Sequence, residues 1–356
     1  MIWIICKDPG GTAGVLPIFY KLRELGKEVT LFANGKAVDL LPEIESDFKA
    51  YKSAEELLKD NLVLPEILVT SMCSKGGVGR DLVPMLRGLD IPTVALQDFW
   101  GSRLGTDWKD PQYWPECICV NDPVASKIVL KAWPDFSEER IQITGYPALD
   151  QYANYDPVQS RVKMRQKLGI VGNIPVILFA GQVQGTGDVI ETVIEASNKL
   201  EDEISLIIRE HPRMRDDAPK EITKWEKAIE SFNNGSLVES SSFDTSLVLA
   251  AADVVLGAFS TVLVHAAVLQ KEVIAVLFPD QGMAEFRRQG GGFRDEFPLV
   301  SLGCAVQAKD QKNLSEFLDK ALNEGLGLEK NQEQTFCLDG KNAERVVQKV
   351  LECLNK

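Results

Sequence analysis

Short apolar runs alternate with amphipathic segments along almost the whole chain, and this alternation limits the fold more than any other feature. The runs are nearly continuous in Ile, Val, Leu and Phe, as in strands that are covered on both faces. The segments between them show helical spacing, and the first ends at Gly26, a residue typical of helix C-termini. Alternating strands and helices predict an α/β fold built on doubly wound parallel sheets. The expected strands cover 1–6, 28–33, 66–71, 91–97, 116–120 and 140–144, then 176–181, 204–210, 236–240, 253–258 and 272–278.

The alternation pauses once, over residues 145–175, a stretch rich in Gly, Pro, Tyr and Asn in which we expect a single helix. A chain of 356 residues is longer than one hydrophobic core usually supports. We therefore expect two Rossmann-like domains, at 1–152 and 153–340. The last segment, 341–356, follows the second sheet, and we expect it to form a helix that packs at the domain junction.

The charge balance narrows the range of partners. The chain has 39 Lys and Arg against 52 Asp and Glu, a formal net charge of -13. Nucleic acids and anionic lipid surfaces require a basic face, so we expect neither as a partner. An anionic ligand must instead be held by helix dipoles and a few local cations.

Other sequence signals indicate a cytoplasmic protein. The N-terminus lacks the basic region of a signal peptide, and no apolar run is long enough for a transmembrane segment. The seven cysteines are scattered along the chain, as expected for reduced thiols rather than a disulfide framework.

Four loops at the expected carboxyl ends of strands are candidate ligand sites, because open α/β sheets bind ligands there. Two are glycine-rich turns at 7–14 and 180–188, a third places a histidine after the strand at 204–210, and the fourth begins a helix at 260. Backbone N–H groups, hydroxyls, a histidine and arginines can all bind a phosphate. The residues expected to bind a ligand that carries phosphate groups are Gly10, Gly11, Gly181, Gln182, Gly185, Arg209, His211, Arg213, Ser260 and Thr261.

Each of these features also has a plain structural interpretation. Ser260 and Thr261 are residue types preferred at helix N-termini without any ligand. The glycines are compatible with ordinary tight turns. His211 could simply satisfy backbone groups of its own turn.

Five short motifs, taken in order, give the sequence a family resemblance. The pattern resembles the GT-B glycosyltransferases, and within that fold the CDP-glycerol glycerophosphotransferases and the bacterial sialyltransferases, which share an HP motif and an SS or ST motif. The resemblance implies two Rossmann-like domains that face a cleft, no cofactor, and a CMP- or CDP-activated donor held by His211, Ser260 and Thr261; UDP is the alternative donor nucleotide. The motifs are DPGGTAG at 8–14, TGYPALD at 144–150, REHP at 209–212, GAFST at 257–261 and DGKNAERV at 339–346.

Group transfer of this kind needs a base for the acceptor hydroxyl and positive charge for the leaving phosphate. Asp8 is the nearest counterpart of the sialyltransferase carboxylate, and Asp98 ends an expected strand beside two aromatic residues. An aspartate needs desolvation to become an effective base at neutral pH. The candidate catalytic residues are therefore Asp8, Asp98 and, at the leaving group, His211. Because no Asp-x-Asp pair follows a strand and no cluster has metal spacing, we expect a metal-independent reaction.

The sequence thus predicts a transferase, either a glycosyltransferase or a glycerophosphotransferase, that acts in envelope polysaccharide biosynthesis. It would move a sugar or a glycerol phosphate from a nucleotide-activated donor to a glycan or lipid-linked acceptor. One alternative is a non-hydrolysing nucleotide-sugar 2-epimerase of the UDP-GlcNAc type, although residues 257–269 lack that family's Ser-Gly-Gly loop with paired acids. The other alternative is a non-catalytic nucleotide-sugar-binding protein.

Overall fold

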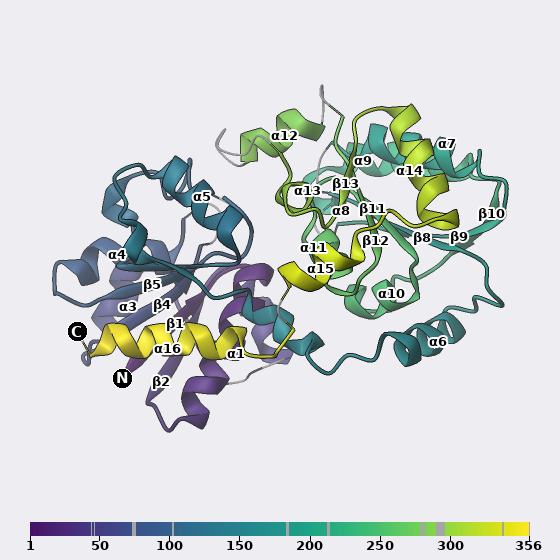
Figure 1. Cartoon of the computed structure of the whole chain (residues 1–356). Coiled ribbons are helices and arrows are strands. Elements are labelled where there is room, and N and C mark those ends of the chain that lie inside the picture. Colours follow the sequence, from purple (N-terminus) through teal and green to yellow (C-terminus); the bar gives the residue numbers. More distant parts are fainter. Residues whose placement is uncertain are drawn as a thin grey trace. The chain divides into compact units, whose positions relative to one another are not determined.

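The chain forms two α/β units (Figure 1). The first contains residues 1–153 and the C-terminal segment from 338, and the second contains residues 154–288 and 296–336. The computed structural model describes residues 1–43, 45, 47–72, 76–101, 103–182, 185–211, 214–278, 282–289, 296–336 and 338–355.

The first unit is built on a parallel sheet whose strand order, within the described residues, is β3-β2-β1-β4-β5-β6-β7. The order runs one way from β1 to β3 and the other way from β4 to β7, so the sheet reverses between β1 and β4. At this reversal Ile4 pairs with Leu31 on one side and with Val69 on the other. The strands are β1 (Ile2–Cys6), β2 (Val29–Ala33), β3 (Lys49–Ala50), β4 (Ile67–Ser71), β5 (Thr93–Leu96), β6 (Cys117–Val120) and β7 (Ile141–Ile143).

Helices cover both faces of this sheet. Apolar residues of α3 and α4, such as Leu57 and Leu82, join Trp3, Ile5 and Phe32 of the strands in one buried cluster. On the other face α1 packs against β1 and β4, and α16 runs beside α1 (Figure 1). The helices are α1 (Pro9–Glu24), α2 (Ala37–Leu40), α3 (Ala54–Asp60), α4 (Val78–Arg87), α5 (Pro123–Ala132) and α16 (Asn342–Leu354), with 3-10 turns η1 (Leu41–Glu43), η2 (Pro111–Tyr113), η3 (Glu138–Arg140) and η4 (Pro147–Tyr152).

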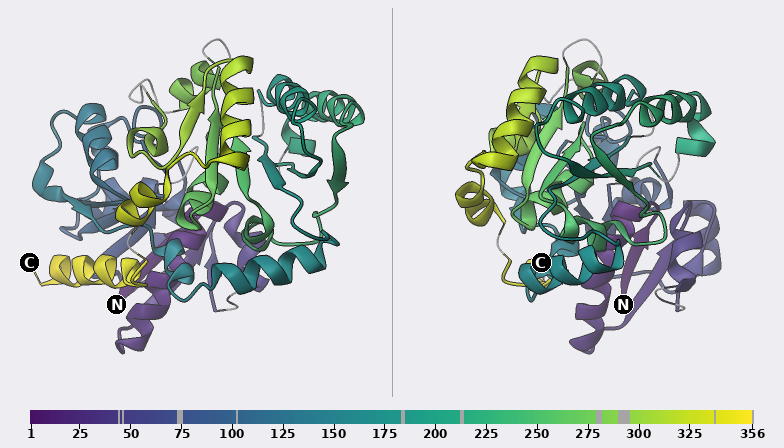
Figure 2. Two further views of the ribbon diagram at one scale, coloured as in Figure 1. Left: turned by 45° about the vertical axis from the view of Figure 1, so that its right-hand side comes forward. Right: turned by 90° about the vertical axis from the view of Figure 1, so that its right-hand side faces the viewer.

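The second unit repeats the plan, with the order β10-β9-β8-β11-β12-β13 among the described strands. The reversal lies between β8 and β11, and Phe179, Leu206 and Trp225 belong to the core beside it. Helix α14 packs along β11, β12 and β13, as the left view of Figure 2 shows in yellow-green. The strands are β8 (Val176–Ala180), β9 (Ile204–Arg209), β10 (Gly235–Val238), β11 (Val254–Gly257), β12 (Glu272–Val276) and β13 (Val306–Ala308). The helices are α6 (Pro157–Lys167), α7 (Gly187–Ser197), α8 (Met214–Asp217), α9 (Pro219–Glu230), α10 (Thr245–Ala251), α11 (Thr261–Val268), α12 (Gly282–Gln289), α13 (Pro298–Ser301), α14 (Gln311–Asn323) and α15 (Glu329–Thr335).

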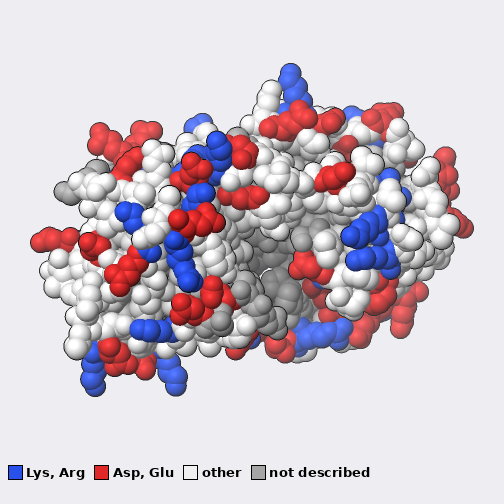
Figure 3. All heavy atoms as spheres, turned by 90° about the horizontal axis from the view of Figure 1, so that it is seen from below, with Lys and Arg blue, Asp and Glu red and all other residues white. Residues whose placement is uncertain are grey.

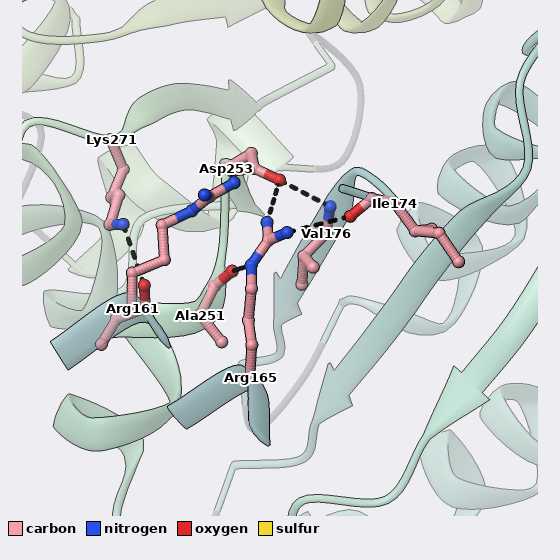
Figure 4. Close-up of polar contacts among 8 residues, drawn as sticks. Arg161, Arg165, Ile174, Val176, Ala251, Asp253 and Lys271 are labelled. Atoms are coloured by element: carbon pink, nitrogen blue, oxygen red, sulfur yellow. Dashed lines mark hydrogen bonds and ion pairs between the residues drawn. The ribbon is translucent and has the colours of Figure 1, made fainter. Parts of the chain in front are cut away.

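A partly buried ionic cluster fixes α6 to the second sheet (Figure 4). Asp253, just before β11, accepts from Arg161 at 2.7 Å and from Arg165 at 2.5 Å, and from the N–H of Val176 at 2.8 Å. Nearby, Lys271 donates to the Ala250 carbonyl at 3.1 Å, and burial lowers the pKa of its ammonium to about 8. All these groups lie at the amino ends of β8, β11 and β12, so the cluster holds the fold at the edge opposite to the expected ligand loops.

Two of the five sequence motifs attach the C-terminal helix to the first unit. The carboxylate of Asp150 accepts from the N–H groups of Asn342 at 2.9 Å and Ala343 at 2.8 Å, and so caps α16. Arg345 donates to the Thr144 carbonyl at 2.9 Å. The motifs TGYPALD and DGKNAERV, far apart in the sequence, therefore fold onto each other and have a structural explanation.

The described surface carries both signs of charge, and acidic and basic side chains are interspersed over the face shown in Figure 3. Local cations are thus available despite the net charge of -13. Among the described helices, none combines the length and the apolar character needed to cross a membrane.

Candidate functional site

In open α/β sheets, ligands bind beside the carboxyl ends of the strands where the strand order reverses. In the first unit the loops at this point follow β1 and β4. In the second they follow β8 and β11. The four loops expected from the sequence follow β1, β8, β9 and β11, so each lies at a carboxyl edge and three flank a reversal.

In the second unit, the loop after β9 carries the HP histidine. His211 is half-buried, and its carbonyl accepts from the N–H of Met214 at 2.8 Å at the start of α8. Arg209 donates from Nη2 to the hydroxyl of Thr245 at 3.0 Å and from Nη1 to the Ser240 carbonyl. Its guanidinium therefore holds the segment after β10. The expected ligand residue Arg213 lies outside the described residues.

The start of α11 presents hydroxyl and N–H groups at the same edge. Ser260 is the N-cap, and its hydroxyl accepts from the N–H of Val262 at 3.2 Å. Thr261, the first helical residue, is exposed, so its hydroxyl and the positive helix end can meet a phosphate. One turn further on, burial lowers the pKa of His265 to about 4. His265 is thus neutral at neutral pH and supplies no charge to a ligand.

The glycines after β8 are explained by packing, backbone conformation and hydrogen bonding within the protein. A Cβ on Gly181 would stand 2.3 Å from the ring of Trp225, so the indole requires glycine there. Gly185 has a φ of +76°, a turn conformation that favours glycine. The N–H of Gly187, which opens α7, donates to the carboxylate of Glu221 at 2.6 Å. This helix end is therefore already neutralised, while the half-buried Gln182 lies at the start of the loop.

In the first unit, both candidate carboxylates lie at the first turn of α1. Asp8 is its N-cap, and Oδ1 accepts from the N–H of Gly11 at 2.9 Å. A Cβ on Gly10 would stand 2.6 Å from Oδ2 of Asp98, and one on Gly11 would stand 2.2 Å from the hydroxyl of Ser71. Gly10 and Gly11 therefore leave space for these two side chains, and they lie in the unit that does not contain His211.

The environment of Asp98 suits a group that exchanges protons. Its Oδ1 is buried and has no hydrogen-bond partner among the described residues. Burial, and then the negative charge of Asp8, raise the pKa of Asp98 to about 7, although backbone N–H groups at Asp98 and Phe99 oppose the rise. A carboxyl with this pKa is poised for general acid–base chemistry at neutral pH.

Sequence reasoning missed two contributors at this edge. Tyr146, in the TGYPALD motif, donates its hydroxyl to the carbonyl of Gly10 at 2.7 Å and so fixes the first turn of α1. A second glycine pair, Gly76 and Gly77, follows β4 and leads directly into α4. Its position between an apolar run and an amphipathic segment was the available signal.

Comparison with known proteins places this fold and sequence in context. Solved structures with the same fold include UDP-GlcNAc 2-epimerase from Neisseria meningitidis, with a TM-score of 0.69 and 14% identity over 99% of both chains. MurG from Acinetobacter baumannii has a TM-score of 0.61 and 13% identity over 99% of both chains. The wall teichoic acid polymerase TagF has a TM-score of 0.60 and 12% identity over 100% of this chain and 89% of its own.

These similarities show the GT-B fold, as the sequence predicted. The comparison with curated protein sequences gave no match. The sequence does match a family of transferases over residues 90–352, well over half of the chain. The protein therefore belongs to the CDP-Glycerol:Poly(glycerophosphate) glycerophosphotransferase family.

Proposed function

We propose that the protein transfers glycerol phosphate from CDP-glycerol to a hydroxyl group of a glycan or lipid-linked acceptor in the synthesis of an envelope polymer. The family match over residues 90–352 carries this proposal. The second unit binds the donor, and the first unit supplies the base for the acceptor.

In the proposed reaction, Asp98 is the base, because its Oδ1 has no partner in the described part of the chain and the pKa of the carboxyl lies near 7. It takes the proton of the acceptor hydroxyl as the oxygen attacks the phosphorus of the glycerol phosphate group. The bond from that phosphorus to the oxygen of CMP breaks, and CMP leaves with the electron pair. Asp8, which neighbours Asp98 and caps α1, keeps the pKa of Asp98 high by its charge.

The donor phosphates bind at the carboxyl edge of the second sheet. The positive end of α11 and the hydroxyl of Thr261 stabilise the charge that develops on CMP. His211 follows β9, the neighbour of β8, and adds a hydrogen-bond donor at the same edge. These groups serve the role that a cation has in other phosphate transferases, and we therefore propose that no metal is required. Transfer that persists after extensive treatment with EDTA supports this point, whereas loss restored by Mg²⁺ contradicts it.

The base assignment is tested by Asp98→Asn. We expect kcat to fall by about 10²–10⁴-fold, the usual contribution of a positioned acid–base group. The affinity for CDP-glycerol, measured by calorimetry, should not change because the donor binds to the other unit. Asp90→Asn is the matched control, since Asp90 is exposed and its φ of +58° suits asparagine. Full activity of Asp98→Asn would remove Asp98 from the mechanism.

The donor site is tested separately by His211→Ala and Thr261→Ala. We expect each to weaken CDP-glycerol binding by at least about tenfold, as loss of a charge-assisted contact does. Ser137→Ala is the control, because Ser137 is exposed and makes no capping bond. Unchanged affinity in both site variants would place the donor elsewhere.

The epimerase remains the second candidate, because its structure superimposes on the chain with a TM-score of 0.69. The same protein preparation is incubated with UDP-GlcNAc, and inversion at C2 is followed by NMR. We expect no inversion. Inversion without transfer from CDP-glycerol would favour the epimerase, and binding of CDP-glycerol without either reaction would favour a non-catalytic binding protein.

A further inference from the structure

The ionic cluster at the amino edge of the second sheet contains more positive than negative charge. Arg161 and Arg165 of α6 and Lys271, just before β12, are its three cations. Among the described residues, Asp253 is the carboxylate whose charge acts on Lys271. Each of its oxygens already accepts from one arginine, at 2.7 and 2.5 Å (Figure 4). With every group ionised, three positive charges therefore stand against one negative charge.

Lys271 is the cation that lacks an anionic partner. Its ammonium donates to the carbonyl of Ala250 at 3.1 Å, and no carboxylate in the described part of the chain forms an ion pair with it. Arg165 donates to the next carbonyl, that of Ala251, also at 3.1 Å, so both cations bind the last residues of α10. A carbonyl at a helix end carries only a partial negative charge and cannot neutralise an ammonium.

The surroundings of Lys271 favour its neutral amine. The side chain is half-buried, and burial is the main reason why its pKa falls from 10.5 to about 8. The charge of Asp253 opposes this fall, whereas the charges of Arg161 and Arg165 add to it. Helix α10 carries no charged residue, and Gln332 of α15 donates only to the backbone carbonyl of Lys271. About a tenth of the amine is then neutral at pH 7, against about three in ten thousand for a pKa of 10.5.

Arg161 has donors available for a further anion. Its side chain is 40% exposed, whereas that of Arg165 is 7% exposed and uses all three nitrogens on two carbonyls and Asp253. In Arg161, Nη2 binds Asp253, while Nε and Nη1 have no partner among the described residues. Figure 4 shows the side chains of Arg161 and Lys271 to the left of Asp253, and their charges act on each other. The open donors of the cluster therefore belong to these two side chains.

A carbamate on Lys271 would balance the cluster. An amine that combines with carbon dioxide becomes a planar group with one negative charge and the shape of a carboxylate. Two negative charges would then stand against the two arginines. The carbamate N–H would keep the hydrogen bond to the Ala250 carbonyl, and its oxygens would accept from Nε and Nη1 of Arg161, in the fork geometry that arginine uses for carboxylates.

We propose that Lys271 reversibly binds carbon dioxide at Nζ as a carbamate that pairs with Arg161. The lone pair of the neutral amine attacks the carbon of CO₂ and forms the N–C bond. One C=O electron pair moves onto oxygen, and a proton leaves the nitrogen for the solvent. The new ion pair joins α6, the first helix of the second unit, to the start of β12. The inference does not depend on the proposed function.

Chemical trapping tests the carbamate directly. The full-length protein is equilibrated with ¹³C-bicarbonate at pH 8 and treated with triethyloxonium, which converts carbamates into stable ethyl carbamates that peptide mass spectrometry assigns to individual lysines. We expect the labelled adduct at Lys271, and at least about tenfold less at Lys312, which is 84% exposed and pairs with Glu316. A dipeptide in the same sample shows that its α-amino group was trapped. No adduct at Lys271, or equal adducts at both lysines, would overturn the proposal.

Two variants test the pairing with arginine. Arg161→Gln should lower the trapped fraction at Lys271 by at least about threefold, because the guanidinium both stabilises the carbamate and disfavours the ammonium. Arg215→Gln is the matched control, since Arg215 is an exposed arginine of the same unit that pairs with Glu210, and it should leave the fraction unchanged. Equal trapping in Arg161→Gln and the wild type would show that the assigned pairing is wrong.

Two further measurements separate a carbamate from simple anion binding. At constant CO₂ the trapped fraction should rise from pH 6 to pH 8, because the neutral amine increases toward its pKa of about 8. Bicarbonate should also raise the midpoint of thermal unfolding above its value in chloride at equal ionic strength, and Lys271→Arg should lose this difference. Stabilisation by bicarbonate without a trapped adduct would mean that the cluster holds the anion non-covalently, and the carbamate would be refuted.

Discussion

Replacing Asp98 with asparagine should make the protein more stable above neutral pH. The pKa of this carboxyl is about 7 in the folded protein, because burial and the charge of Asp8 disfavour ionisation. Its ordinary value is 3.8. Below pH 3.8 the group is protonated in both states and costs nothing. As the pH rises, the unfolded chain ionises first, so stability is lost progressively until about pH 7.

The difference between these two pKa values corresponds to an upper limit of about 4 kcal/mol. An asparagine amide at the same place also lacks partners, so we expect Asp98→Asn to recover only about 1–3 kcal/mol at pH 8. The gain should shrink toward zero as the pH falls toward 3.8, the pKa of the unfolded chain.

Urea unfolding followed by tryptophan fluorescence measures the change in stability, and the signal comes mainly from the structural unit that contains Asp98. Of the six tryptophans, all but Trp225 lie in the first unit, so the signal reports mainly on the surroundings of Asp98. Asp90→Asn serves again as the control and should change little at any pH. An Asp98→Asn variant that is less stable than the wild type at pH 8, or equally stabilised at pH 4 and pH 8, would refute the electrostatic reasoning.

Three further predictions follow from the same structure. The transfer rate should rise with pH to a plateau with an apparent pKa of about 7, and this rise should be absent in the residual activity of Asp98→Asn. Asp150→Ala removes both carboxylate oxygens that accept from N–H groups at the start of α16. The free energy of unfolding, measured by thermal or urea unfolding, should fall by about 1–3 kcal/mol. An unchanged free energy of unfolding would contradict the capping role. Gly181→Ala should destabilise the protein by about 1–3 kcal/mol, because the added Cβ would collide with the ring of Trp225. Gly185→Ala should cost only about 1 kcal/mol, because this position has open space and only its positive φ is unfavourable for alanine. Equal effects of the two substitutions would contradict the packing argument.

The sequence predicted the two sheets because their strands are continuous apolar runs, a signal that does not depend on distant contacts. It missed β3 and β13, which are edge strands of two and three residues with few apolar side chains. Such short strands form only because a neighbouring strand is already in place, and no local pattern marks them.

The roles of the glycines were harder to predict. A glycine-rich turn indicates that space is needed, but the sequence does not say what fills it. At Gly181 the space is filled by the indole of Trp225, and at Gly10 it is filled by the carboxylate of Asp98. Both neighbours are distant in the sequence and reach the glycine only through the folded sheet. For the same reason Asp8 and Asp98 were predicted singly, and their proximity required the structure.

The first turn of α1 contains several features that disfavour stability. Gly10 and Gly11 stand in the first turn of the helix, and glycine loses more backbone freedom on folding than any other residue. A Cβ on either would collide with Asp98 or Ser71, so both glycines are needed there. The carboxylate of Asp98 lies over this turn, beside the carboxylate of Asp8, and its Oδ1 has no hydrogen-bond partner among the residues that the structure describes. Selection for stability alone would replace Asp98, because a neutral side chain fits the same space without the cost of a buried charge. Residues that disfavour stability tend to cluster where a protein binds a ligand or carries out a reaction. Here Tyr146, the N-cap of η4, holds the turn in place through its hydrogen bond to the Gly10 carbonyl. The energetic pattern therefore supports the proposed reactive edge of the first unit, and this support does not depend on the family resemblance.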